Sequence, residues 1–120
     1  MRIRTKLRLQ GSVTPPALNT ETDIINLGDQ TDDYIVEGLV SLQNMASGDT
    51  VVLNVYVAVD GVNQILVDTW TFTGAQTVKA VRIVAHTLAY NSKFRVTVNQ
   101  TAGTLRSFPY SFIVEVMEVI

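Results

Sequence analysis

The chain has 120 residues, of which 47% are hydrophobic and only 17% are charged, whereas about a quarter of the residues in an average soluble domain are charged. This length fits one domain. The sequence contains no cysteine and one histidine, His86. These counts exclude disulfides, thiol catalysis, iron–sulfur clusters and zinc sites built from cysteines or from several histidines of one chain.

The formal net charge of −2 is unevenly distributed along the chain. The first ten positions hold Arg2, Arg4, Lys6 and Arg8 and no acidic residue, while the remaining 110 positions hold five basic and eleven acidic residues. We therefore interpret residues 1–10 as a basic N-terminal arm or edge strand, and residues 11–120 as a single acidic β-sandwich domain.

Side chains alternate between apolar and polar along most of the chain, which predicts β-strands. The first strand covers residues 2–9 and ends at Gly11 and Pro15-Pro16, and an isolated apolar pair, Ile24-Ile25, follows in a polar stretch. Pro109 predicts that the outer part of the last strand lies at an edge or a bulge. Further strands are expected at 34–42, 50–59, 62–73, 78–86, 93–101 and 107–117.

Asp60-Gly61 is the clearest turn signal, because this dipeptide tolerates the positive φ angles of a tight hairpin turn. A two-residue turn there would pair Leu53 with Asp68 and place a carboxylate on the apolar face. We therefore expect a longer loop or a bulge in this hairpin.

No segment of ten or more residues has a helical period. Seven to eight strands separated by regular turn signals predict an all-β fold, an antiparallel β-sandwich, with a jelly roll preferred over an immunoglobulin-like arrangement. The alternation does not reveal the order of the strands. The sequence also lacks the apolar run of a secretory signal or a membrane helix, which predicts no membrane partner.

Several positions that alternation assigns to the outside of the sheets are apolar, and the chain has only three lysines to guard its strand edges. This pattern favours a permanent homo-oligomer or lattice over a somewhat hydrophobic monomer. The arm could exchange with an acidic neighbour or be an ordinary solvated edge strand. Nucleic acid is disfavoured, because no aromatic residue interleaves the basic ones. The candidate interface residues are Arg2, Arg4, Lys6, Arg8, Val52, Tyr56, Ile113 and Met117.

No catalytic motif, cofactor site or metal site stands out, and we predict that the chain is not an enzyme. Residues 21–33 hold five carboxylates that could contribute to a calcium site, but they do not follow an EF-hand spacing, which favours a solvated acidic loop. His86 is interpreted as a surface or strand-end residue. Tyr56 and Trp70 could form a glycan-stacking platform, the basis of an alternative carbohydrate- or receptor-binding function, although a lone tryptophan in a sandwich is more often a core residue.

Short segments between residues 34 and 114 resemble small β-sandwich virion proteins of tailed phages and archaeal viruses. These segments are Gly48-Asp49-Thr50, Asp68-Thr69-Trp70-Thr71-Phe72-Thr73-Gly74, Phe94-Arg95-Val96-Thr97-Val98 and Gln100-Thr101-Ala102-Gly103. The resemblance implies a capsid decoration or minor capsid protein, located in the virion and assembled in the host cytoplasm. The implied partners are the chain itself, with a trimer as one option, and other capsid proteins.

Overall fold

A computed structural model describes residues 2–118, with the side chain of Arg4 left undescribed. This part of the chain forms eight strands and no helix, and hence no helix that could cross a membrane. The strands are β1 (Arg2–Val13), β2 (Thr22–Asn26), β3 (Tyr34–Ser41), β4 (Thr50–Val57), β5 (Ile65–Thr73), β6 (Ala80–Leu88), β7 (Arg95–Ala102) and β8 (Phe108–Glu118). They build an elongated molecule of 51 × 25 × 20 Å.

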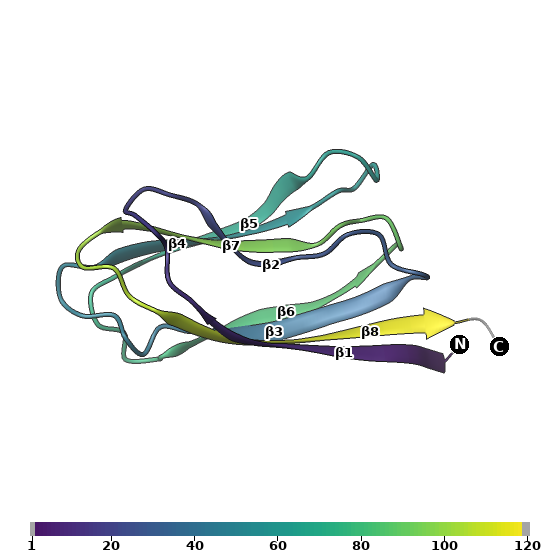
Figure 1. Ribbon diagram of the computed structural model, residues 1–120, viewed down its shortest axis with the longest axis horizontal. Coiled ribbons are helices and arrows are strands. Elements are labelled where there is room, and N and C mark those ends of the chain that lie inside the picture. Colours follow the sequence, from purple (N-terminus) through teal and green to yellow (C-terminus); the bar gives the residue numbers. More distant parts are fainter. Residues whose placement is uncertain (1, 119–120) are drawn as a thin grey trace.

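The strands form two four-stranded sheets that face each other (Figure 1). The first sheet has the order β1-β8-β3-β6 and the second has the order β2-β7-β4-β5, with antiparallel pairing throughout. Outward along the chain from the β4–β5 hairpin, β3 pairs with β6, β2 pairs with β7, and β1 pairs with β8. Successive pairs lie in alternate sheets. This nesting of eight strands is the jelly-roll arrangement, so the predicted fold class is confirmed.

The core lies between the sheets and is made by alternate residues of each strand. Val51, Leu53 and Val55 of β4 are fully buried, and so are Phe112 and Val114 of β8. These are the faces that alternation predicts, because successive side chains of a strand point to opposite sides of its sheet. A sandwich of this kind leaves the intervening residues of each strand on the two outer faces.

The hairpin at Asp60-Gly61 has both a longer loop and a bulge, the two features that the sequence offered as alternatives. Residues 58–64 separate β4 from β5, Gly61 has a φ of +80°, and the register shifts between Val55 and Tyr56. This bulge pairs Trp70, and not Asp68, with the buried Leu53. Asp68 pairs instead with the buried Val55, so its carboxylate stays on the inward-facing side of this edge strand, where it is exposed.

Strand β1 continues through Gly11 to Val13 and does not end at the glycine. Gly11 pairs with Tyr110 of β8, and an added Cβ there would lie 3.0 Å from the Tyr110 hydroxyl. The glycine thus makes room for the tyrosine ring, and the pairing continues on either side of it.

Two other local features refine the predicted strands. The pair Ile24-Ile25 belongs to a separate strand, β2, in which both side chains are buried. Strand β8 is internal to its sheet, but the pairing with β3 stops at Tyr110, so Pro109 pairs only with Ser12 of β1. The missing N–H of the proline therefore lies where the strand has one neighbour, as expected.

Candidate assembly surface

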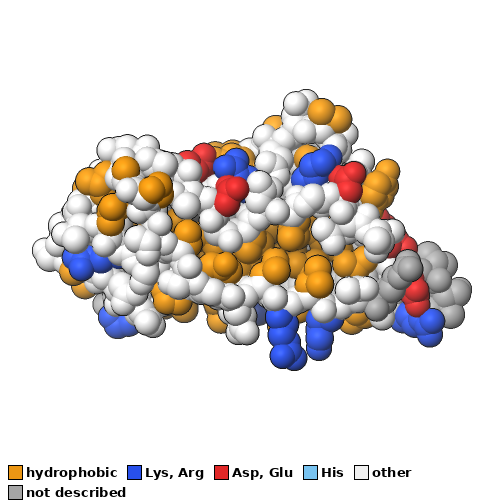
Figure 2. Space-filling model, in the orientation of Figure 1, with side chains coloured by type: hydrophobic (Ala, Val, Ile, Leu, Met, Phe, Trp, Pro, Cys, Tyr) orange, Lys and Arg blue, Asp and Glu red, His pale blue; other side chains and the backbone are white. Residues whose placement is uncertain are grey.

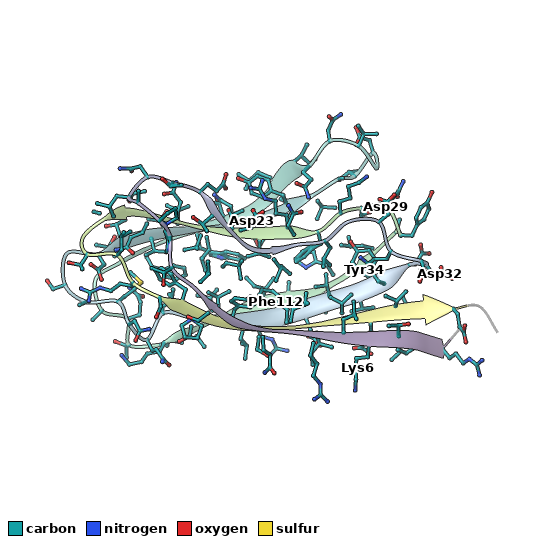
Figure 3. All side chains as sticks on the ribbon, in the orientation of Figure 1. Lys6, Asp23, Asp29, Asp32, Tyr34 and Phe112 are labelled. Carbon is teal, nitrogen blue, oxygen red and sulfur yellow. The ribbon has the colours of Figure 1, made fainter. Side chains whose placement is uncertain are left out.

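Past its bulge, strand β1 places Lys6 and Arg8 on the outer face of the first sheet. Lys6 lies opposite Glu115 of β8, and Arg8 lies opposite Ile113. Figure 3 shows Lys6 pointing away from the sandwich. The row of basic residues is thus exposed, with an acidic residue of the same chain beside it.

The outer end of β1 is held by its own chain. The Arg2 guanidinium contacts the Glu118 carboxylate at 2.6 Å. Arg2 remains exposed, and exposed ion pairs contribute little to stability. The basic residue at the start of β1 therefore has an acidic partner within its own subunit.

Apolar side chains share this outer face with the basic residues. Ile113 is 38% exposed and Leu39 of β3 is 48% exposed. Together with Arg82, Ile83 and Ser111 they line a shallow hollow of about 310 Å³. At the other end of the face, the bulge in β1 pairs the exposed Ile3 with the half-buried Met117. Apolar groups thus recur along this face and remain exposed within the part of the chain that the structure describes.

The other two apolar interface candidates lie on the opposite outer face. Val52 and Tyr56 of β4 are half-buried and point out of the second sheet, away from Leu53 and Val55. The structure therefore brings Lys6, Arg8, Ile113 and Met117 to one face of the sandwich and leaves Val52 and Tyr56 on the other. The side chain of Arg4 is outside the described part of the structure.

A polar cluster occupies the outer face around Tyr56. The Oε2 atom of Glu21 accepts hydrogen bonds from Tyr56 Oη at 2.5 Å, Thr97 Oγ1 at 2.6 Å and Asn54 Nδ2 at 3.1 Å. The Arg95 guanidinium lies 5.2 Å from the centre of the Tyr56 ring. This cluster attaches the β1–β2 connection to the outside of the second sheet, so Tyr56 already has partners within the subunit.

The hydrogen bonds of this cluster change the acidity of two groups. Burial opposes ionisation of Glu21, but donation from Thr97, Tyr56 and Asn54 and the charge of Arg95 outweigh it, so the pKa of Glu21 lies below its ordinary value. Conversely, the hydrogen bond to Glu21, together with burial, raises the pKa of the Tyr56 hydroxyl. Near neutral pH the cluster therefore contains an ionised carboxylate and a neutral tyrosine.

The structure does not bring the two candidate stacking residues together. Trp70 pairs with the buried Leu53 and packs on the core, so it points into the sandwich. Tyr56 points out of the same sheet. Because two rings on opposite faces of a sheet cannot stack on one ligand, they do not form a shared glycan platform.

The five carboxylates between residues 21 and 33 have separate partners. Asp23 contacts the Arg95 side chain at 2.6 Å, Asp29 contacts Lys93 at 3.2 Å, and Asp33 accepts the Tyr90 N–H at 3.1 Å. Over residues 2–118, apart from the undescribed Arg4 side chain, no three His, Cys, Asp or Glu side chains gather where they could hold a metal ion. The carboxylates of this segment instead make local contacts with neighbouring strands and loops.

His86 lies on β6, which is an edge strand of the first sheet. Its Nδ1 atom is 2.7 Å from the Val84 carbonyl, and its ring centre is 5.0 Å from that of Phe94. The ring is half-buried against the core at this edge. His86 is therefore a half-buried residue that packs against the core from an edge strand.

Two features with structural consequences were missed by the sequence analysis. Asp49 is buried, and its carboxylate accepts hydrogen bonds from Arg106 Nε at 2.7 Å, Ala46 N at 2.9 Å and Thr104 N at 3.1 Å. Burial opposes its ionisation, but these donors outweigh it and lower the pKa of Asp49. The second feature is Leu39, whose outward position could be read from the alternation of β3.

No known protein family matches the sequence, and no curated protein matches it either. Solved structures share its fold. A chain from the structure titled "Bacillus endospore appendages form a novel family of disulfide-linked pili" superposes with a TM-score of 0.59 and 14% identity, over 98% of this chain and 92% of that chain.

Further similar structures come from infectious bursal disease virus. Its VP2 subviral particle superposes with a TM-score of 0.50 and 12% identity, over 93% of this chain. The structure of its Gx strain gives a TM-score of 0.52 at 11% identity. The chain spans about a third of the length of these viral chains, 32% and 31%. Taken together, the topology and these neighbours define a jelly-roll β-sandwich.

Proposed function

We propose that this chain is a non-enzymatic structural subunit that assembles with copies of itself, as a capsid decoration or minor capsid component of a virion. The observation that carries this proposal is the uncovered apolar surface of the first sheet, where Leu39 is 48% exposed and Ile113 is 38% exposed. Leaving such side chains in water forfeits about 25 cal/mol for each Å² of apolar area that a neighbour could bury.

The fold neighbours support this proposal without identifying the partner. One neighbour comes from appendages described as disulfide-linked pili and others come from virus particles. Because this chain has no cysteine, its own contacts would have to form without disulfides. The placement of Tyr56 and Trp70 on opposite faces gives no support to the alternative of a glycan-binding module.

Electron microscopy of the purified chain at micromolar concentration tests the proposal. We expect rings, filaments, sheets or shells built from repeating units of one size. A field that contains no assembled objects over the whole concentration range would contradict it. The decoration role would be supported if an antibody raised against the chain labels the surface of virus particles from the source of this sequence.

A further inference from the structure

The four edges of the two sheets differ in charge. The first sheet ends at β1 and β6, and the second ends at β2 and β5. Strand β1 contains four basic residues and no acidic one, and β6 contains Arg82 and no acidic residue. The only charged residue of β2 is Asp23, and the only one of β5 is Asp68. Both edges of the first sheet are therefore basic, and each edge of the second carries one carboxylate, of which Asp23 is already paired with Arg95.

This distribution selects among the ways in which copies could meet edge to edge. Joining β1 of one copy to β6 or β1 of another would bring basic strands together, and joining β5 to β2 or β5 would bring acidic strands together. Like charges on adjacent strands are destabilising, whereas opposite charges are favourable. A basic edge of one copy therefore fits an acidic edge of the next.

Strand β5 is the better acceptor of the two acidic edges. It has nine residues, whereas β2 has five. Its first three side chains are exposed and apolar: Ile65 is 50%, Leu66 is 51% and Val67 is 44% exposed. The strand has no lysine and no proline, which are the residues that commonly guard an edge against pairing. One edge donor, the Thr69 N–H, is occupied by the Asp68 carboxylate at 3.0 Å.

Strands β1 and β5 lie on different sides of the molecule. Residues of β1 and β2, among them Leu9 and Ile24, line a common hollow of about 340 Å³, so these two edges lie on the same side (Figure 1). Figure 2 shows hydrophobic side chains between the sheets on this side and basic side chains extending below it. Strand β5 ends the second sheet at the opposite edge from β2. A contact between β1 and β5 must therefore join two copies.

We propose that copies of this chain join side to side, with β1 of one copy added as a strand to the free edge of β5 of the next. This inference rests on the proposed assembly function and names the strands that carry it. Main-chain hydrogen bonds supply the affinity of such strand addition, and side chains supply its specificity. Because the contact joins two different edges, every copy offers one donor and one acceptor edge, and repeating the contact generates a ring or a filament.

The absence of native cysteine allows a direct test with matched Thr→Cys variants on three edges: Thr5→Cys on β1, Thr71→Cys on β5 and Thr87→Cys on β6. All three threonines are exposed. Pairs of variants are mixed and treated with a flexible bismaleimide. We expect covalent dimers when the β1 and β5 variants are mixed, and no dimers from the β1 and β6 mixture or from any single variant. Crosslinking of β1 to β6, or of β5 to itself, would overturn the proposal.

A charge placed on the acceptor edge provides a second test. Leu66→Lys should raise the concentration at which half of the chains are assembled by about tenfold, while Val78→Lys, in the exposed β5–β6 connection, should leave it unchanged. Equal effects of the two variants would contradict the edge assignment. If the chain assembles but β1 and β5 do not crosslink, the edge assignment fails and the proposed function stands. A chain that stays monomeric at every concentration contradicts both.

Discussion

Gly38 shows how a single residue sets the packing between two neighbouring strands of the first sheet. An added Cβ at this position would lie 2.3 Å from Cδ2 of Phe112 and 2.5 Å from the Ser111 carbonyl oxygen. Both neighbours are constrained, because Phe112 is fully buried and the carbonyl belongs to the backbone of β8. The glycine thus allows β3 and β8 to approach each other.

Replacing this glycine should therefore destabilise the fold. We expect Gly38→Ala to lower the free energy of unfolding by about 1–3 kcal/mol, the usual cost of overpacking a core. Gly28→Ala is the matched control, because its Cβ would meet no atom within 4 Å, and it should change the stability by less than about 0.5 kcal/mol. Urea denaturation of both variants measures the difference, and equal midpoints would contradict the packing role.

Asp49 joins two loops through a buried carboxylate, and this predicts a dependence of stability on pH. The ordinary pKa of an aspartate is about 3.9, and the Asp49 pKa is lowered in the folded chain. Its contribution is therefore fully present above the unfolded-state pKa and is lost as the pH falls through the folded-state pKa. Asp49→Asn removes this contribution at every pH.

We expect Asp49→Asn to cost about 2 kcal/mol at pH 7, as is typical when a charged hydrogen bond is lost. The difference from the wild type should shrink below pH 4, and urea titrations at several pH values measure it. Asp29→Asn, which loses only an exposed ion pair with Lys93, should cost less than about 1 kcal/mol. A pH-independent difference between Asp49→Asn and the wild type would show that the carboxylate charge is not what stabilises the loops.

At the scale of the elements, alternation identified strands and faces because a period of two directly reports which side chains share a side. It therefore located the buried faces of β4, β7 and β8 and flagged the conflict at Asp68. It could not reveal that β8 lies between β1 and β3, because alternation carries no information about which strand is the neighbour. The extension of β1 past Gly11 was also hidden, since the space for Tyr110 exists only once β1 and β8 are paired.

The same limit applies to the candidate surface. Ile113 and Met117 could be recognised as outward from β8 alone, but their proximity to Lys6, Arg8 and Leu39 depends on the order of three strands. The contact between Glu21 and Tyr56 likewise joins residues that are 35 positions apart. Only the paired sheets show that this contact engages Tyr56 within its own subunit.

The β1–β2 connection gives a prediction at this scale. Glu21→Ala removes the acceptor of three hydrogen bonds on an exposed surface, and should lower the free energy of unfolding by about 1 kcal/mol. Amide hydrogens of β2 should exchange faster, while those of the buried β4 stay protected. Tyr56→Phe, which removes only one of the donors, should have a smaller effect. Unchanged exchange in β2 would contradict the role of Glu21 in attaching this strand.

At the scale of the whole molecule, the edge strands of the two sheets differ in charge, with basic edges on one sheet and acidic edges on the other. Contacts between exposed opposite charges are screened over about 8 Å at physiological ionic strength and over shorter distances at higher salt. Raising sodium chloride should therefore weaken assembly, which sedimentation velocity can measure. Assembly that is unaffected by salt would indicate that apolar contacts alone hold the copies together.

The claim on which this account depends is that one copy of the chain binds another through surfaces left uncovered in the single subunit. Size-exclusion chromatography with light scattering, over micromolar concentrations, measures this most directly. The account predicts a mass that is a multiple of the single chain and that falls on dilution or on introducing Leu66→Lys. A mass of one chain at every concentration would contradict it.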